Sequence, residues 1–193
     1  MEGRRPKVVY DANVLLPFHT AHLLAFVAAP PSVLVDARWT AKIQSEWVER
    51  SLEKFPALTR SSIEARRDAM NRAMPGAMVV GYEGLIDTIE FPDPDDRHVV
   101  AAALHCGAKT IVTRDRKHFT EAALAPYGLK RADPDDLLVE LYDAEPELTL
   151  DAIEAARLVL RKSMPDWGTY LDILDTEGFT ELVRRIRDHH PQP

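Results

Sequence analysis

Short apolar runs that alternate with longer amphipathic segments constrain the fold of this chain more than any other feature. The runs 7–10 and 109–113 have the length and composition of buried strands. Further strands are expected at 32–35, 77–80 and 128–131, and helices at 15–29, 40–55, 58–74 and 94–106. The alternation predicts an α/β three-layer sandwich, in which helices cover both faces of a mainly parallel central sheet.

Aspartates occur where two of these strands end and where one helix begins. Asp11 follows the first run, Asp115 follows 109–113 by two residues, and Asp96 opens the helix expected at 94–106. Open α/β sheets bind ligands at the carboxyl ends of their strands. Carboxylates gathered there repel one another unless a cation joins them, and oxygen ligands favour Mg²⁺ or Mn²⁺ over zinc. We therefore expect these three aspartates to hold a metal, with Glu46 of helix 40–55 at the edge of the site.

Each of these acids also has a structural interpretation. The sequence DPDD at 93–96 is an ordinary helix start, and the same four letters recur at 133–136. We interpret the second copy as structural, because no strand with a further acid follows it. Asp36 is a rival ligand because it too follows an apolar run, but no second acid supports it. Asp11 could be an N-cap; we expect Asn13 to cap the next helix while Asp11 points at the metal.

Three cations surround Asp115 in the sequence, namely Arg114, Arg116 and Lys117. This segment is either a solvated turn or an electropositive rim that holds a phosphate while Asp115 holds the metal. His118 follows directly and is a candidate acid or base. A metal-activated water, however, needs no histidine to become a nucleophile.

Composition leaves a nucleic-acid substrate open. The formal net charge is −7, which does not favour nucleic-acid binding, but bound metal would offset the proposed site acids. The single cysteine, Cys106, excludes an intramolecular disulfide and fits a reducing cytosol. No apolar run approaches the ~18 residues of a membrane span. We therefore expect a soluble cytoplasmic protein that is not secreted and does not contact a membrane.

The last fifty residues form a separate helical segment. A boundary near 143–149 divides the chain into a main domain, 1–143, and an extension, 144–193. Helices are expected at about 150–163, 167–174 and 178–188. This extension is too short for an independent core. Its apolar faces must pack on the main domain, on a second copy in a homodimer, or on a protein inhibitor.

The chain resembles the PIN-domain nucleases, and most closely the VapC-like toxins of bacterial type II toxin–antitoxin systems. The matching stretches are VVYDANVL at 8–15, the segment 39–47, DPDDRHVVAAAL at 93–104 and TIVTRD at 110–115, which together cover roughly residues 5–140. The resemblance implies a PIN-like fold with four site acids, Asp11, Glu46, Asp96 and Asp115. It gives supporting positions to Asn13, Asp93 and Thr113.

The implied function is that of a Mg²⁺- or Mn²⁺-dependent endoribonuclease with RNA as its substrate and a cognate antitoxin as its partner. Arg114, Arg116 and Lys117 would then face the RNA. The alternatives are a catalytically inactive PIN-fold regulatory or binding module, and a DNA-directed metal-dependent nuclease. RNA is preferred to DNA on family likeness alone. A phosphatase of the haloacid dehalogenase type usually needs a second aspartate where this chain has Asn13.

Overall fold

The structure, a computed structural model, describes residues 5–164 and 166–189. Its sheet has four strands, all parallel, in the order β2-β1-β3-β4. The strands are β1 Lys7–Tyr10, β2 Asp36–Arg38, β3 Thr110–Val112 and β4 Lys130–Ala132. The α-helices are α1 Ala12–Leu15, α2 Phe18–Ala28, α3 Ala41–Lys54, α4 Arg60–Ala73, α5 Arg97–Cys106, α6 Glu121–Leu124, α7 Pro134–Ala144, α8 Pro146–Val159, α9 Trp167–Thr176 and α10 Thr180–His189. The expected α/β class and parallel sheet are confirmed.

The strand order has its topological switch point between β1 and β3. Val9 of the central strand β1 is in register with Arg38 of β2 on one side and with Ile111 of β3 on the other. The chain therefore runs outward from β1 to β2 and returns to the opposite side of β1 to form β3. Sheets of this topology bind ligands where the order reverses, beyond the carboxyl ends of the two strands. Asp11 and Thr113 follow those two ends directly.

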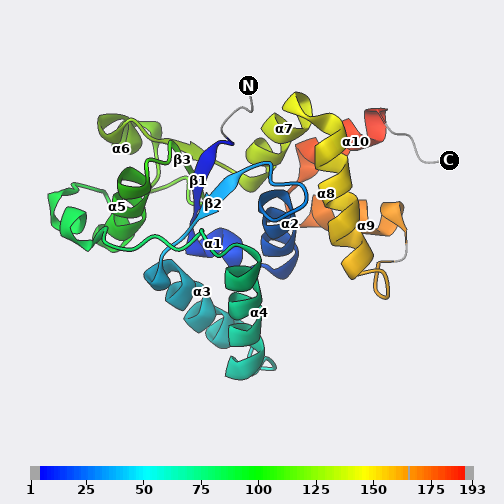
Figure 1. Cartoon of the computed structure of the whole chain (residues 1–193), viewed down its shortest axis with the longest axis horizontal. Helices are drawn as coiled ribbons and strands as arrows, with labels where there is room; N and C mark the ends of the chain where they lie inside the picture. Colours follow the sequence, from blue (N-terminus) through cyan, green and yellow to red (C-terminus); the bar gives the residue numbers. More distant parts are fainter. Residues whose placement is uncertain (1–4, 165, 190–193) are drawn as a thin grey trace.

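Helices cover the sheet and enclose one apolar core. In Figure 1, α5 and α6 lie on one side of the strands and α2 with α8 on the other, while α3 and α4 pack together below. Helix α5 contacts both β1 and β3, and its Val100 is fully buried, as are Val9 and Ile111. Because β1 and β3 are buried on both faces, their sequences are continuous apolar runs rather than alternating patterns.

The second strand begins four residues later than the sequence predicts. Strand pairing starts at Asp36, whereas Leu34 and Val35 donate their backbone N–H groups to Val27 O, in the last turn of α2. Those amides are unavailable to a sheet because the helix end already binds them. Asp36 therefore opens β2 at its amino end instead of following it, and it pairs with Arg38. This position separates it from the carboxyl ends of the strands.

Three other elements differ from the expected ones. The segment 77–80 forms only an isolated bridge, in which Met78 pairs with Trp39 beyond the end of β2. The helix expected at 15–29 is split into α1 and α2 at Pro17, whose backbone is extended with a ψ of 131°. Proline has no N–H with which to continue the hydrogen bonding of α1. Helix α1 thus begins directly after Asp11. The last strand is Lys130–Ala132, slightly later than 128–131.

The helices that carry two of the expected acids form where the sequence predicts them. Thr40 caps α3 by accepting the Ile43 N–H at 3.1 Å. Pro94–Asp96 is a 3₁₀ turn that leads into α5. Gly107 ends that helix with a φ of 73°, a left-handed conformation that glycine adopts without strain.

The extension packs on the main domain of the same chain. Helix α8 contacts α2 and α7, α10 contacts α7, and α9 contacts α2. The apolar faces expected from the sequence are buried, with Ile153, Phe179 and Leu182 at 0% exposure. Of the three surfaces considered for these helices, the main domain is therefore the one that covers them. No helix among residues 5–164 and 166–189 has both the length and the hydropathy required to cross a membrane.

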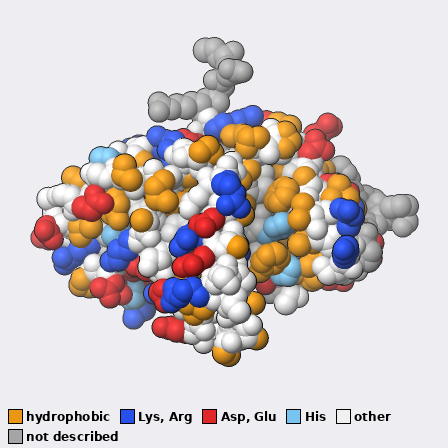
Figure 2. Space-filling model, turned by 60° about the horizontal axis from the view of Figure 1, so that its bottom comes forward, with side chains coloured by type: hydrophobic (Ala, Val, Ile, Leu, Met, Phe, Trp, Pro, Cys, Tyr) orange, Lys and Arg blue, Asp and Glu red, His pale blue; other side chains and the backbone are white. Residues whose placement is uncertain are grey.

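The face that carries α3 and α4 is intermixed in charge. Figure 2 shows acidic and basic side chains alternating across this face, with hydrophobic side chains on either side. Arg60 pairs with Glu49 at 2.7 Å, and Arg67 with Asp68 at 2.9 Å. Exposed pairs of this kind add little stability. On the described part of this face, Arg60 and Arg67 are thus each paired with a neighbouring acid.

Candidate functional site

Asp11 lies at the centre of a hydrogen-bond network at the end of β1. Its Oδ1 caps α1 by accepting the Ala12 N–H at 2.6 Å. Its Oδ2 accepts from Asn13 Nδ2 at 2.6 Å and from Thr113 Oγ1 at 2.8 Å. The expectation that Asn13 caps the helix was therefore wrong: Asp11 is the cap, because its main chain turns directly from β1 into α1. Asn13 instead joins the ends of β1 and β3, since its Nδ2 also contacts Thr113 Oγ1 at 2.7 Å.

Burial changes the ionisation of Asp11. The residue is only 6% exposed. This burial raises the pKa of the Asp11 carboxyl above its ordinary value, although the hydrogen bonds from Thr113 and Ala12 act in the opposite direction. The charge of Glu46 raises the pKa further. Asp11 and Glu46 are thus electrostatically coupled although they come from different elements.

Asp96 shows most clearly that negative charge is concentrated here. Burial raises the pKa of its carboxyl to about 6, and repulsion from Asp11, Asp93 and Asp115 adds to the rise. A carboxylate in this position costs free energy in the absence of a cation. Asp96 therefore lies within electrostatic reach of the acids that follow β1 and β3.

Asp115 is held by the turn that follows β3. Its Oδ1 accepts the backbone N–H groups of Lys117 at 2.8 Å and His118 at 2.9 Å, and its Oδ2 lies 2.8 Å from His118 Nδ1. Burial raises the pKa of the Asp115 carboxyl, but the hydrogen bonds from His118 and Lys117 outweigh it, so that the pKa lies below its ordinary value. Asp115 therefore remains charged beside Asp96, which protonates more readily.

His118 connects the acids of the two segments. Its Nδ1 lies 3.6 Å from Asp96 Oδ2 and 3.8 Å from Asp93 Oδ2, in addition to its contact with Asp115. Asp93, Asp96 and His118 each offer one ligand atom, and these atoms all lie within 4.8 Å of one another. Asp93 was expected as a supporting residue and possible extra ligand, and His118 as an acid or base. A carboxylate-rich set whose members repel one another fits a hard divalent cation.

Glu46 reaches the site from α3 and is oriented by a buried histidine. Glu46 Oε1 lies 3.0 Å from His98 Nε2 and 3.9 Å from Lys42 Nζ, and the Glu46 side chain is 27% exposed. His98 is on the first turn of α5 and only 2% exposed. The sequence alone gave His98 no part in orienting Glu46. Its place two residues after Asp96, at the start of an apolar helix, is the signal that could have identified this role.

The three cations beside Asp115 differ in their surroundings. Arg116 is 75% exposed at its side chain and lies 3.7 Å from Asp133, and Lys117 is also exposed. The half-buried Arg114 side chain instead donates to Glu177 O at 2.5 Å. The second DPDD segment is structural, as expected. Asp133 caps α7, and Asp135 accepts the N–H groups of the first turn of α10.

Comparison with known proteins assigns the class to which this fold and site belong. A family model described as a PIN domain matches residues 7–117, which is more than half of the chain, so the chain belongs to the PIN-domain family. A second model, described as the VapC50 C-terminal domain, matches residues 134–188. It covers α7 to α10 almost completely.

One curated relative is similar over part of its length. The chain is 42% identical over 73 residues to a Mycobacterium tuberculosis protein described as "Putative ribonuclease VapC50". The match covers 38% of this chain and 43% of that protein, so it spans less than half of either one. No solved structure matches the chain significantly.

Proposed function

We propose that this protein is a metal-dependent endoribonuclease of the VapC type, which hydrolyses RNA phosphodiester bonds. The observation that carries the proposal is the convergence of the Asp93, Asp96 and Asp115 carboxylates on His118, in a chain that belongs to the PIN-domain family. The name of the relative and the match to the VapC50 C-terminal domain support RNA as the substrate.

The donor set fits Mg²⁺ or Mn²⁺. Asp11, Asp96 and Asp115 would hold the ion, with Glu46 at the edge of the site and Asp93 as a further donor. His118 lies among the same carboxylates. Divalent ions of this kind supply Lewis-acid stabilisation of the charge that develops on a phosphate, and they activate water.

The protein side chains have separate tasks in this mechanism. Thr113 and Asn13 hold the Asp11 carboxylate through its Oδ2, and His98 orients Glu46. The exposed cations Arg116 and Lys117 would contact the phosphates that flank the cleaved bond. Such a division keeps the acids rigid while the surface cations bind a flexible substrate.

A toxin of this type would have a cognate antitoxin as its partner. We extend the proposal to such an antitoxin from the VapC likeness of both matched segments. Coexpression with the adjacent open reading frame, followed by size-exclusion chromatography, tests this part. Copurification in a fixed ratio with loss of RNA cleavage supports it, whereas unchanged cleavage in the presence of the neighbouring protein contradicts it.

The nuclease proposal is tested with purified protein and two end-labelled oligonucleotides of the same sequence, one RNA and one DNA. We expect cleavage of RNA in Mg²⁺ or Mn²⁺, no cleavage in EDTA, and none by the Asp96→Asn variant. Cleavage of DNA alone would favour the DNA-directed alternative. Metal binding without cleavage of either oligonucleotide would favour an inactive binding module.

A further inference from the structure

Arg114 lies between two parts of the candidate site in the sequence. It follows Thr113, which donates to Asp11, and precedes Asp115. Its backbone N–H donates to Asn13 Oδ1 at 3.1 Å, and the next backbone N–H, that of Asp115, donates to Thr113 Oγ1 at 3.1 Å. The main chain of Arg114 is therefore part of the network that joins the acid after β1 to the acid after β3.

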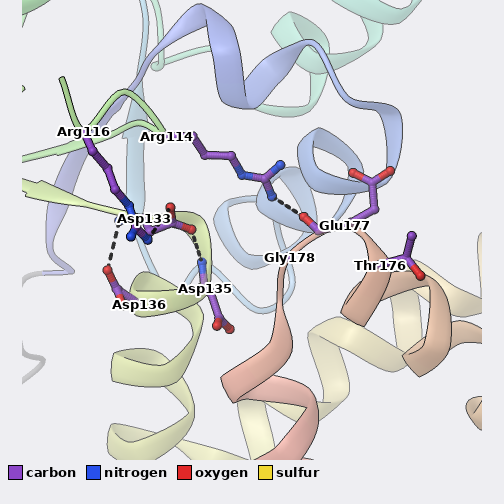
Figure 3. A pocket seen from close by; sticks show the side chains of 8 residues that line it. All are labelled: Arg114, Arg116, Asp133, Asp135, Asp136, Thr176, Glu177 and Gly178. Carbon is purple, nitrogen blue, oxygen red and sulfur yellow. Dashed lines mark hydrogen bonds and ion pairs between the residues drawn. The ribbon is translucent and has the colours of Figure 1, made fainter. Parts of the chain in front are cut away.

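The side chain of Arg114 points away from the acids and toward the C-terminal helices. Its Nη2 donates to Glu177 O at 2.5 Å and to Thr20 Oγ1 at 3.2 Å. The guanidinium carbon lies 5.9 Å from the centre of the buried Phe179 ring. Figure 3 shows the guanidinium directed at the main chain of Glu177. Both residues line a cleft of about 340 Å³. Arginine is well suited to this position because a helix C-terminus presents partial negative charge.

The turn that receives Arg114 is itself fixed. Gly178 has a φ of 91°, and a Cβ at this position would lie 3.7 Å from Arg114 Nη2. Glu177 Oε2 accepts from Thr20 Oγ1 at 3.0 Å, and Phe179 is fully buried. The turn between α9 and α10 is therefore anchored to α2 and to the core, so that its carbonyl group can hold the guanidinium in place.

We propose that Arg114 is a positioning residue through which the C-terminal helices hold Asp115 and the Asn13–Asp11 pair in their active arrangement. The part that concerns activity rests on the proposed nuclease function. The positioning itself does not, because it follows from bonds at both ends of one residue. The C-terminal helices thus act on the site through the half-buried Arg114, although none of the site acids lies on these helices.

The central experiment compares Arg114→Met with Arg161→Met. Methionine keeps an unbranched apolar side chain but removes the guanidinium donors. Arg161, in the turn that follows α8, is a matched control, because it is exposed and donates to Leu158 O in its own segment. Hydrogen exchange of the full-length protein, measured by NMR without metal, reports on the amides of Asp115, Lys117 and His118. We expect Arg114→Met to accelerate their exchange at least about 10-fold, and Arg161→Met to leave it unchanged.

A second measurement is the affinity for Mn²⁺ by calorimetry. Residues that orient metal ligands typically contribute about 10- to 100-fold to metal affinity, so we expect Arg114→Met to weaken Mn²⁺ binding within this range. In the RNA assay, kcat should fall while KM stays close to that of the wild type. Arg114→Lys should restore part of the Mn²⁺ affinity and part of kcat, because an ammonium group can still donate to Glu177 O.

Two results would overturn the proposal. Faster exchange confined to residues 177–179, with unchanged Mn²⁺ affinity, would show that Arg114 only docks the helices. A raised KM with unchanged kcat would assign Arg114 to direct RNA binding. If Arg114→Met does not fold, Thr20→Val provides the same comparison by removing one of the two acceptors. A wild type that cleaves no RNA would refute the proposed function, while the exchange measurement would still decide the positioning role.

Discussion

Replacing Asp96 by asparagine should stabilise the protein without metal and reduce the stabilisation that it gains from metal. The folded protein raises the pKa of Asp96 from its ordinary 3.8 to about 6. One pKa unit corresponds to about 1.4 kcal/mol, so the ionised carboxylate costs up to about 3 kcal/mol above pH 6. Because the side chain is 24% exposed, solvent screens part of this cost. We expect Asp96→Asn to gain about 2 kcal/mol at pH 7.5 in EDTA.

The pH dependence gives this prediction its sign. A carboxyl whose pKa is raised on folding favours the folded state below the unfolded pKa, and that contribution is lost as pH rises through the folded pKa. The advantage of Asp96→Asn over the wild type should therefore disappear as pH falls from about 6 to about 4. For a chain of this length, about 2 kcal/mol corresponds to a Tm difference of about 4–8 °C.

Thermal and urea unfolding measure the effect, with Asp95→Asn as the matched control. Asp95 lies in the same 3₁₀ turn before α5 but is exposed, so its substitution reports any contribution of negative charge at a helix start. Mn²⁺ at about 100 times its Kd should add about 2.7 kcal/mol to the wild type, and clearly less to Asp96→Asn. Equal stabilities of the variant and the wild type in EDTA at pH 7.5, or a gain that persists at pH 4, would refute the reasoning.

Three further predictions follow from the same structure. Asp11→Asn and Asp115→Asn should each abolish RNA cleavage while the circular dichroism spectrum stays native, because each removes a negative ligand but keeps the shape of the side chain. If either variant cleaves RNA at the wild-type rate, the substituted aspartate takes no part in the mechanism. Mg²⁺ or Mn²⁺ should restore activity after EDTA treatment and zinc only poorly, whereas full cleavage in EDTA would indicate metal-independent chemistry at His98 or His118. Deleting 144–193 should lower solubility, measured by sedimentation, because it uncovers the buried surface around Ile153 and Leu182; a soluble truncated protein with an unchanged oligomeric state would contradict this.

Local patterns in the sequence determined the class of fold and the placement of the site acids in the chain. Buried strands must be apolar, helices need caps and stops, and acids at strand ends must meet when the strands are parallel. For this reason β1 and β3, the cap at Thr40 and the end of α5 at Gly107 could be predicted. The burial of the C-terminal helices also followed, because amphipathic faces require a partner surface.

Tertiary contacts decided the remaining features, since they join residues whose separation in sequence carries no local signal. The start of β2 depends on amides that the end of α2 already binds. The Glu46–His98 contact joins helices that are distant in the chain, and Arg114 meets Glu177 across 63 positions. Periodicity states which face of an element is apolar, but only the packed structure determines which donor meets which acceptor across those faces.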